Sequence, residues 1–501
     1  MFKKYIKFNK PTLVIGTLFT FFGILGLYLW SSNNFSMSEI AALSVTNRTI
    51  NTYFLAIITA MALIITLTSN LYSPRLAKLF VSHPIAVTGI VYIVCTNFFI
   101  AISHLVPIDS DLFKIFSFLS FSFVLIAMVG MIPFLFYISK FVKPSYFVPL
   151  MGKNGLKEIA RIHNDKLPTE MRKKECGDYF DLVDVLSNMT MTSIKRGDRL
   201  VTSLVLKEMF LHLRKFIALR NDKQVDQIWR KRFSRFPLGM SEEAKYYLKK
   251  YEVWPESYLL SKILEVYKVF HERDNELVPF VCRELTNVVD DSLNLNDRLM
   301  IKLQLKMLNS MLRRSLSTNN EEAFSSILYY YRINIELLLD DDDLCEDTIY
   351  YFIYYGKLAR RLNQPKAVKS FLFSIGRIMN YLCFESPDRA LMFYNKFIKD
   401  IWLDLVSSEG LYRDYAMKSI IKTFWSLYSQ NYSHLSSMIQ AEFLSNSQAH
   451  AMYLDEMLYS TDPLDKEFSD ELVSPEHMSG MALSLASDFL KDFNLNKSHT
   501  R

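Results

Sequence analysis

The sequence predicts an all-α protein in which four transmembrane helices are followed by a large helical cytoplasmic domain. Three observations support this fold class: four long uncharged stretches in the first 140 residues, charged residues concentrated after them, and apolar residues at helical spacing in the remainder. The 501 residues are 50% hydrophobic and include 14 Gly and 15 Pro, which excludes a disordered chain, a collagen and a small disulfide scaffold. The net charge of +6 is small for this length, so we expect no nucleic-acid partner.

The predicted transmembrane domain comprises residues 1–144. Its four spans lie at about residues 12–30, 53–71, 85–106 and 115–138, and none of these ranges contains Asp, Glu, Lys or Arg. The two shortest have 19 residues, which at 1.5 Å rise per residue extend roughly 28 Å, close to the thickness of the hydrocarbon core. One such stretch alone is compatible with a soluble core helix, but four in succession indicate membrane spans.

Positively charged residues near the span ends predict the orientation in the membrane. Lys and Arg resist translocation, and here they gather before the first span, between the second and third, and after the fourth: Lys3, Lys4, Lys7, Lys10, Arg75, Lys78, Lys140 and Lys143. We therefore expect a multi-pass protein of the plasma (inner) membrane with both termini in the cytoplasm. The basic start would also suit a secretory signal peptide, but no A-x-A-like cleavage site follows Trp30.

The predicted spans contain few polar residues. Asn97 is the most polar mid-span residue, and His104 follows seven residues later on the same helical face. An Asn in hydrocarbon normally hydrogen-bonds to a neighbouring helix, whereas ion or proton coupling usually needs charged residues at this depth. A channel or transporter lined by Asn97, His104 and the hydroxyl-rich second span (Thr66, Thr68 and Ser69) stays open as a second functional hypothesis.

The predicted cytoplasmic portion has a basic membrane-proximal helical region at residues 145–235 and a distal helical domain at residues 236–501. Residues 195–235 hold twelve Lys or Arg against four acids, which favours contact with anionic lipid headgroups; a solvated basic helix face is the alternative. We expect Arg75, Lys78, Lys140 and Lys143 to contact lipid or the cytoplasmic domain.

The distal domain shows helical periodicity, as in Ile301, Leu305, Leu308 and Leu312, and we expect about 14 to 16 helices after residue 145. The stretch 356–362 followed by 367–371 is similar to a tetratricopeptide helix pair, although no clean 34-residue period recurs. A degenerate helical-hairpin array and an irregular helical domain are both compatible with this pattern.

Catalytic signatures are missing from the sequence. It contains no P-loop, GxGxxG, GxSxG, HExxH or EF-hand loop, so we expect no cofactor, identify no catalytic residue and lean against an enzyme. Five cysteines without a CxxC motif are expected to be unpaired thiols. Asp340, Asp341, Asp342 and Asp343 are weak candidates for a divalent-metal site, but the apolar residues on either side favour a turn between helices, with one of these acids as the N-cap.

One region resembles a known family. Ala41-Ala42-Leu43-Ser44, a second span rich in small and hydroxyl residues, and the loop Tyr72-Ser73-Pro74-Arg75-Leu76 are similar to a family of predicted bacterial membrane proteins known as domain of unknown function 2254. The resemblance covers the first ~145 residues by layout. It implies four spans and a helical cytoplasmic portion, and it implies no activity. A weaker likeness at Gly197-Asp198-Arg199 has Gly and Arg where the family has an Asn-Asp-Pro turn.

These observations lead to three functional hypotheses. The first is an integral inner-membrane protein whose helical cytoplasmic domain is a scaffold that binds membrane lipids or an unknown protein partner, with a homo-oligomer left open. The second is the channel or transporter. The third is a membrane-anchored, divalent-dependent enzyme that uses the acids at residues 340–343.

Overall fold

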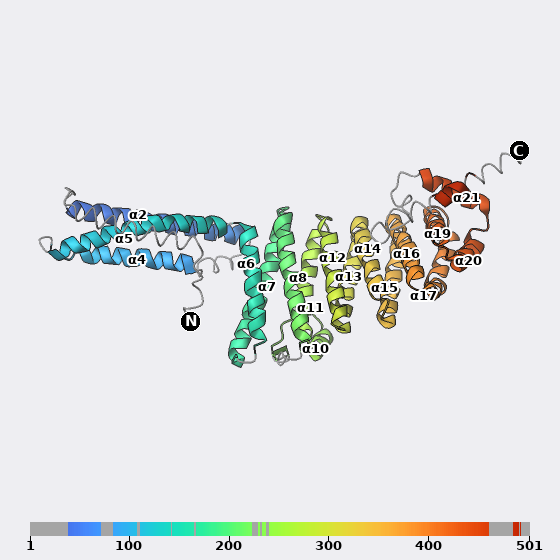
Figure 1. The fold of residues 1–501 in the computed structure, drawn as a ribbon, viewed down its shortest axis with the longest axis horizontal. Coiled ribbons are helices and arrows are strands. Elements are labelled where there is room, and N and C mark those ends of the chain that lie inside the picture. Colours follow the sequence, from blue (N-terminus) through green and yellow to red (C-terminus); the bar gives the residue numbers. More distant parts are fainter. Residues whose placement is uncertain are drawn as a thin grey trace. The chain divides into compact units, whose positions relative to one another are not determined.

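The computed structural model of the chain describes residues 39–71, 84–107, 111–141, 143–164, 167–222, 229–230, 233–236, 240–459, 484–489 and 491. Every regular element in these residues is a helix, which confirms the all-α prediction (Figure 1). Fifteen α-helices begin at or after Pro144 in this part of the chain, within the range that the sequence predicts.

Contacts divide the chain into two compact units. The first, called unit 1 here, contains residues 1–158 and 177–208; the second, unit 2, contains residues 159–176 and 209–501. The domain boundaries that the sequence suggests at residues 144 and 235 stay predictions; parts of the region 145–235 belong to each unit.

Unit 1 begins with three long helices that contact one another: α2(Glu39–Leu71), α4(Pro84–Ser103) and α5(Asp111–Phe141). Their inner faces form one apolar cluster, made of Ile50, Ile57, Met61, Ile93, Ile100, Phe113, Val124 and Phe134. Two polar contacts join α4 to α5: the Tyr92 hydroxyl donates to the Phe123 carbonyl at 3.0 Å, and the Ser103 and Ser120 hydroxyl oxygens lie 3.0 Å apart. Apolar packing and a few hydroxyl bonds therefore hold the three helices together.

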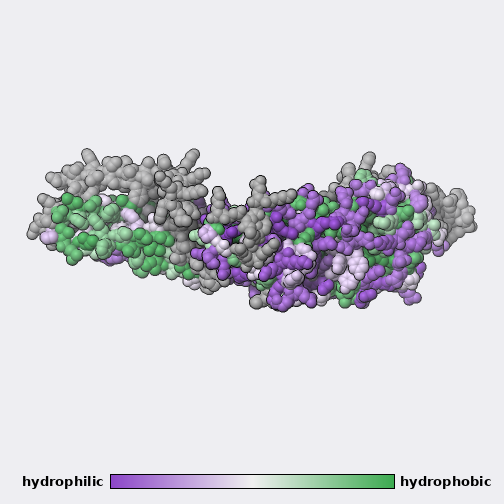
Figure 2. Space-filling model, turned by 90° about the horizontal axis from the view of Figure 1, so that it is seen from below, coloured by the Kyte–Doolittle hydropathy of each residue, from purple (hydrophilic) through white to green (hydrophobic). Residues whose placement is uncertain are grey.

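The outer faces of these three helices are also apolar. Leu55, Phe98 and Phe136 have exposed fractions of 66%, 69% and 61%. Figure 2 shows hydrophobic side chains gathered on the visible face of this part of unit 1.

The four predicted spans are not confirmed by the structure. The range 12–30 lies outside the described residues, whereas 53–71, 85–106 and 115–138 correspond to parts of α2, α4 and α5. Among the helices of the described ranges, none meets the combined requirement of length and apolar character for crossing a bilayer.

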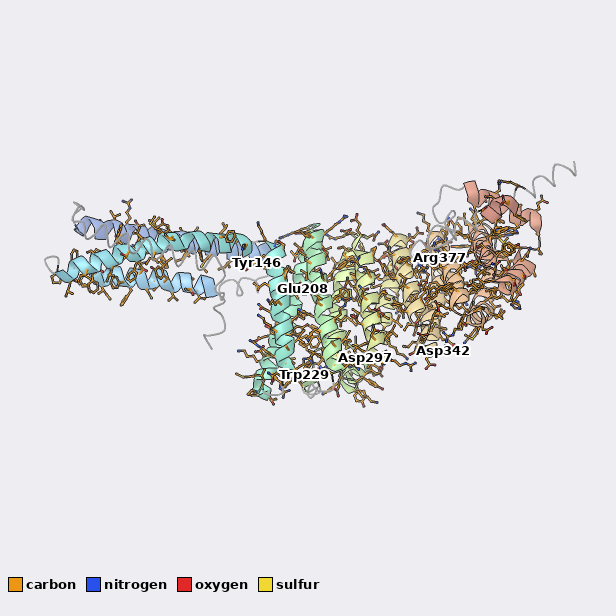
Figure 3. The ribbon with its side chains drawn as sticks, viewed as in Figure 1. Tyr146, Glu208, Trp229, Asp297, Asp342 and Arg377 are labelled. Atoms are coloured by element: carbon orange, nitrogen blue, oxygen red, sulfur yellow. The ribbon has the colours of Figure 1, made fainter. Side chains whose placement is uncertain are left out.

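Three further helices follow: α6(Pro144–Ile162), α7(Thr169–Lys195) and α8(Arg199–Arg220). Unit 1 includes α6 up to residue 158, α7 from residue 177 and α8 up to residue 208. Gly152 allows close approach of a polar side chain, since a Cβ there would lie 1.9 Å from the Glu208 Oε2. Burial raises the pKa of Glu208, which Figure 3 labels. At the turn between α7 and α8, Gly197 has φ +73° and the Asp198 carboxylate caps α8 by accepting from the Val201 N–H at 3.0 Å.

Unit 2 is a two-layered array of antiparallel helices (Figure 1). Its main helices are α10(Glu242–Lys250), α11(Trp254–Phe270), α12(Leu277–Asn294), α13(Arg298–Ser317), α14(Glu321–Leu337), α15(Asp342–Arg361) and α16(Pro365–Glu385). They are followed by α17(Pro387–Phe393), the π-helical turn η2(Tyr394–Ile398), α18(Lys399–Val406), α19(Leu411–Ser429), α20(Ser433–Phe443) and α21(Ser447–Tyr459). In one layer α12, α14, α16 and α19 contact each other in succession, and in the other α11, α13 and α15 do so.

The array has a period of 44 residues. Helices α12, α14 and α16 begin 44 residues apart at Leu277, Glu321 and Pro365, and α11, α13 and α15 follow the same interval from Trp254. The helix pair that the sequence suggests at 356–371 is the hairpin of α15 and α16, where a Cβ on Gly356 would lie 2.4 Å from the Phe371 ring. The helical-hairpin alternative is thus the one that the structure shows, with a longer period than a tetratricopeptide repeat.

Asparagine makes the turns of the array possible. Asn296, Asn319 and Asn363 have φ values of 53°, 53° and 54°, in the left-handed region that Asn tolerates better than most residues. The next residue then begins the following helix: Asp297 accepts a hydrogen bond from the Met300 N–H at 3.2 Å, and Asn320 accepts one from Ala323 at 3.0 Å. A left-handed residue followed by a capping residue therefore recurs along the array.

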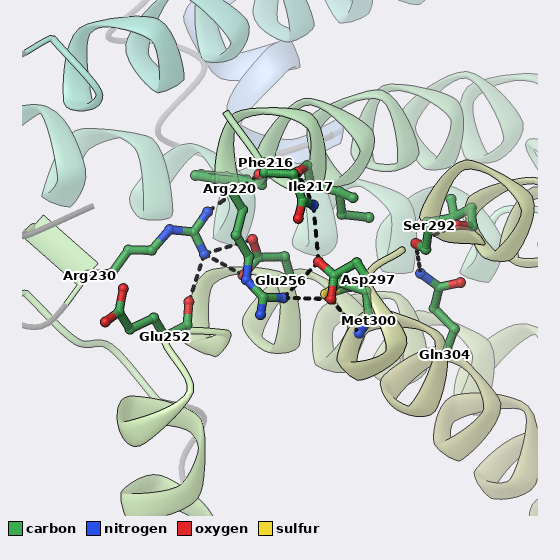
Figure 4. Close-up of polar contacts among 12 residues, drawn as sticks. Phe216, Ile217, Arg220, Arg230, Glu252, Glu256, Ser292, Asp297, Met300 and Gln304 are labelled. Carbon is green, nitrogen blue, oxygen red and sulfur yellow. Dashed lines mark hydrogen bonds and ion pairs between the residues drawn. The ribbon is translucent and has the colours of Figure 1, made fainter. Parts of the chain in front are cut away.

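Buried polar contacts fix the first helices of the array (Figure 4). The Arg230 and Glu256 side chains are fully buried, and the Arg230 Nη1 donates to both carboxylate oxygens at 2.7 and 2.8 Å and to the Glu252 carbonyl at 2.7 Å. Nearby, the Arg220 Nη1 donates to the Asp297 carboxylate at 3.0 and 3.2 Å. Such pairs are costly to bury, and they stabilise the fold only while both partners are present.

Candidate binding groove

A groove of about 990 Å³ lies along one edge of unit 2. It is lined by the turn after α11, the turn after α13, the first residues of α14 and α16, and one residue of α19: His271, Glu272, Arg273, Asp274, Asn275, Thr318, Asn319, Asn320, Glu321, Glu322, Ser325, Lys366, Lys369, Ser370 and Tyr415. The 44-residue period explains its length, because each hairpin brings the start of one helix to the same edge.

Side-chain amides connect the successive turns at the groove. The Asn320 Nδ2 donates to the His271 carbonyl at 2.5 Å and to the Asn275 Oδ1 at 2.8 Å, and the Asn275 Nδ2 donates to the Glu322 carboxylate at 2.7 Å. His271 itself is buried; its Nε2 lies 3.2 Å from the Thr318 hydroxyl, and burial lowers its pKa. The wall of the groove is therefore a fixed polar network rather than a set of free side chains.

The charge along the groove changes from one end to the other. Near the α12 and α14 starts, four carboxylates outnumber the single guanidinium of Arg273, whereas Lys366 and Lys369 supply cations on α16. The four carboxylates belong to Glu272, Asp274, Glu321 and Glu322. Ion pairs hold part of this set, with the Arg314 guanidinium 2.5 Å from Glu272 and the Lys366 ammonium 3.6 Å from Glu321. At the basic end, the Lys369 ammonium lies 5.5 Å from the centre of the Tyr415 ring.

The opposite edge of the array holds the four consecutive acids at residues 340–343. Asp341 is the N-cap of α15, and it also pairs with Arg298, which lowers the pKa of the Asp341 carboxyl. The Asp342 carboxylate lies 3.2 Å from the Arg389 guanidinium, and Asp343 lies 3.6 Å from Arg298. In Figure 3, Asp342 and Asp297 both lie at this edge, where they mark the starts of α15 and α13.

This edge confirms the predicted turn between helices. The predicted cap, one of the four acids, is Asp341, whose extended backbone precedes the helix and whose carboxylate accepts a hydrogen bond from the Leu344 N–H. Among the residues that the structure describes, no three His, Cys, Asp or Glu side chains are grouped to hold a metal ion.

Four further predicted site residues are described, all of them in unit 1: Lys140, Lys143, Asn97 and His104. Lys140 and Lys143 are exposed, and the Lys140 ammonium lies 4.3 Å from the Phe136 ring. Asn97 is half-buried on α4, and His104 is exposed just after that helix. Arg75 and Lys78 lie outside the described residues, as do the side chains of Thr68 and Ser69. The Thr66 hydroxyl donates to the Ala62 carbonyl of its own helix at 2.8 Å.

The cysteine thiols are unpaired, as the sequence predicts. Cys176, Cys282, Cys345 and Cys383 are buried, whereas Cys95 is exposed. Burial raises the pKa of Cys176 and Cys383 to about 12 and that of Cys345 to about 11. Burial also raises the pKa of Cys282, and thiols with such raised pKa values hold their protons at neutral pH.

Sequence reasoning missed the groove. Its residues are ordinary polar side chains at helix ends, and they come together only through the 44-residue period. One sequence signal could have indicated them: Asn319-Asn320 recurs 44 residues later as Asn363-Gln364. The first residue of each pair has a left-handed backbone, but the second residue differs. In the second pair, Gln364 begins α16 without capping it, and its Nε2 donates to the Leu316 carbonyl of the preceding repeat at 2.7 Å.

Comparison with family models, with curated proteins and with solved structures finds no match for this chain. The resemblance to domain of unknown function 2254 stays a prediction, and the Ser73-Pro74-Arg75 loop on which it depends lies outside the described residues.

Proposed function

We propose that this chain is a membrane-associated scaffold whose helical-hairpin array binds an extended segment of a protein partner in the groove. The observation that carries the proposal is the groove of about 990 Å³, which crosses the α14 and α16 starts and reaches α19. Stacked helical hairpins present extended surfaces of this kind, on which a peptide contacts several repeats in turn.

The lining favours a peptide over a small organic ligand. Pockets for such ligands are mostly apolar with a few convergent polar groups, whereas this groove is lined almost entirely by polar and charged side chains. An extended peptide carries backbone N–H and C=O groups that can exchange hydrogen bonds with the Asn, Ser and Thr side chains along it. Its length also suits a site spread over successive hairpins.

Membrane association is the second part of the proposal. It is supported by the exposed apolar side chains on α2, α4 and α5, and by the absence of Asp, Glu, Lys and Arg from the 20 residues of α4. Lipid would cover the outer faces of these helices at little cost, and the exposed Lys140 and Lys143 would lie where the chain leaves the apolar region. A second copy of the chain is the alternative cover.

Binding in the groove can be tested with the purified full-length protein in detergent. Random 12-residue peptides displayed on phage would be selected on the protein and their affinities measured. We expect Lys369→Ala and Tyr415→Ala each to weaken the selected peptides by about ten-fold, because both side chains line the basic end. The matched control is Tyr350→Ala, an exposed tyrosine on α15 in the other layer. Peptides that bind all three variants equally well would contradict the proposal.

Membrane association needs a separate measurement. Flotation of the full-length protein with liposomes, before and after an alkaline wash, distinguishes lipid-embedded helices from a chain held by surface charge. We expect the protein to float after the wash. Protein that stays at the bottom of the gradient, as a stable dimer by light scattering, would identify a second copy as the cover of α2, α4 and α5.

A further inference from the structure

The chain changes direction between α5 and α6, within unit 1. Pro144 is the first residue of α6 and has no N–H to donate, so the hydrogen bonding of α5 cannot continue through it. In Figure 1, α6 runs across the direction of α2, α4 and α5, and Figure 3 labels Tyr146 near its start. Leu150 of α6 is partly buried and packs against the apolar cluster of these three helices. The side of α6 that carries Leu150 is therefore turned toward them.

Three other side chains share this side of α6. Tyr146, Leu150, Lys153 and Lys157 follow each other at intervals of four, three and four residues, which places all of them on one face of the helix. Tyr146, Lys153 and Lys157 are exposed and are called the basic face of α6 here. The buried residues of the same stretch lie around the other side of the helix: Phe147, Val148 and Met151.

The basic face carries positive charge without an acid to balance it. In the part of the chain that the structure describes, neither the Lys153 nor the Lys157 ammonium is paired with a carboxylate. The sequence from residue 112 to residue 157 contains no Asp or Glu. The next acid is Glu158, and one of its carboxylate oxygens is buried. An anion that approaches this face therefore meets cations that are free to pair with it.

Further side chains extend this surface. Lys140 and Lys143, at the junction of α5 and α6, are also exposed. From Tyr146 to Lys157 the helix rises about 16 Å at 1.5 Å per residue, so one small anion cannot contact both ends of the basic face. Tyr146 is 40% exposed and combines an apolar ring with a hydroxyl, as do the aromatic residues that are enriched at bilayer boundaries. The arrangement fits an extended anionic surface.

The neighbouring helices favour a membrane as this surface. The outer faces of α2, α4 and α5 are apolar, so lipid around them would end near the junction of α5 and α6. The side of α6 that is turned toward these helices would then meet the lipid headgroups. Lysine suits this place, because its long stem can lie against apolar lipid while the compact ammonium reaches a phosphate.

We infer that α6 lies along the membrane surface and that its basic face binds the headgroups of anionic phospholipids. This inference rests on the proposed membrane association and adds the class of lipid. Lys140 and Lys143 contact the same headgroup layer from the end of α5. Each lysine near an anionic surface contributes about a five-fold increase in affinity at low salt.

The test measures the headgroup preference of the full-length protein in detergent at low salt. Phosphatidylglycerol and phosphatidylcholine with identical acyl chains and the same fluorophore are titrated with protein, and the anisotropy of the labelled lipid reports binding. We expect phosphatidylglycerol to bind at least about 25-fold more tightly, and the double variant Lys153→Gln/Lys157→Gln to reduce this preference about 25-fold. The control Lys249→Gln/Lys250→Gln removes the same charge from exposed positions on α10 of unit 2 and should leave the preference unchanged.

Equal affinity of the unmodified protein for the two lipids would overturn the inference, and this comparison does not depend on a variant that folds. If the protein still floats with liposomes after the alkaline wash, the proposed membrane association stands and only the lipid class is wrong. Failure to float would overturn both. A preference that is lost in the α10 variant but kept in the α6 variant would place the lipid on unit 2 and overturn the inference. Release of phosphatidylglycerol by inorganic phosphate at equal concentration would identify a site for free anions and would overturn it too.

Discussion

The two units of this protein treat large apolar side chains in opposite ways. In α2, α4 and α5 of unit 1, apolar residues form both the inner cluster and the outer surface, as the exposed Leu55 and Phe98 show. In the array of unit 2, most large apolar side chains are buried, and many of its charged side chains form ion pairs between neighbouring hairpins. A helix by itself therefore does not indicate whether it is surrounded by water, by protein or by lipid. The polarity of its outer face does.

The two units also differ in the contacts that stabilise them. Unit 2 has a core of buried apolar side chains, a fully buried ion pair between Arg230 and Glu256, and side-chain caps at helix starts such as Asp297. The three long helices of unit 1 pack through a small inner cluster and leave apolar area on the outside. We therefore expect substitutions in unit 2 to change the stability of its fold. Substitutions on the outer faces of α2, α4 and α5 should instead change the contact with the lipid or protein that covers these helices.

The largest effect should come from breaking the buried ion pair of unit 2. Glu256→Ala leaves the Arg230 guanidinium in a fully buried site with only carbonyl partners, and we expect a loss of about 3–5 kcal/mol in the free energy of unfolding. Urea unfolding followed by circular dichroism measures it. The control is Glu242→Ala, whose exposed pair with Lys245 should be worth less than about 1 kcal/mol. A small effect of Glu256→Ala would mean that water reaches Arg230.

The inner and outer faces of α2 should differ sharply. Ile57 is 5% exposed in the inner cluster, so Ile57→Ala should destabilise unit 1 by about 2–5 kcal/mol. Leu55, two residues earlier and 66% exposed, should tolerate the same truncation within about 0.5 kcal/mol in detergent. Thermal unfolding of the two variants in one detergent gives the comparison. Similar losses for both would show that the outer face is packed against another protein surface.

Acid should weaken the end of the array. Burial lowers the pKa of His450 to about 4, and its Nε2 accepts a hydrogen bond from the Trp425 indole at 3.1 Å. Because the folded-state pKa lies below the unfolded value of 6.5, the neutral form stabilises the fold fully above pH 6.5, and this contribution is lost as the pH falls toward 4. The loss should reach about 3 kcal/mol at pH 4.

The measurement is the free energy of unfolding at pH 7 and at pH 4 for the native chain and for His450→Gln, which keeps an acceptor for Trp425 but does not titrate. We expect the difference between the two proteins to change with pH in favour of the variant at low pH. A pH-independent difference would mean that His450 is solvated in the folded state.

The smallest effect should occur at the edge with the four consecutive acids. Asp341→Ala removes the N-cap of α15 and the partner of Arg298, and we expect a cost of about 1 kcal/mol. Arg298 lowers the pKa of Asp341, so the contribution is present above the ordinary pKa of 3.8 and is lost as the pH falls below it. Asp340→Ala is the control, since Asp340 does not cap the helix. We expect added Mg²⁺ to change neither result. If Mg²⁺ raised the free energy of unfolding of the native chain but not that of Asp341→Ala, the metal hypothesis would be supported.

The sequence was sufficient for the fold class and for individual helices. Ile301, Leu305, Leu308 and Leu312 are all buried on α13, as their spacing predicts. Periodicity within one helix reports which side is buried, because the same residues must face the core at every turn.

Periodicity within single helices could not predict the 44-residue period of the array. Core positions in successive hairpins accept any apolar residue of suitable size, so the repeat leaves little trace in them. The turns preserve it, in the left-handed Asn319 and Asn363 and in the caps Asp297 and Asp341, since the two members of each pair are 44 residues apart. The groove depends on residues that are one period apart, and without the period the residues that line it together could not be identified.

The matching caps at Asp297 and Asp341 mean that the array is modular. Deleting residues 298–341 would join Asp297 directly to Asp342, so that one aspartate takes the place of the other at the head of α15. The shortened chain would lose one hairpin and keep the register of the hairpins on both sides. Unit 2 can thus be lengthened or shortened in whole units, and the reach of its ligand would change with it.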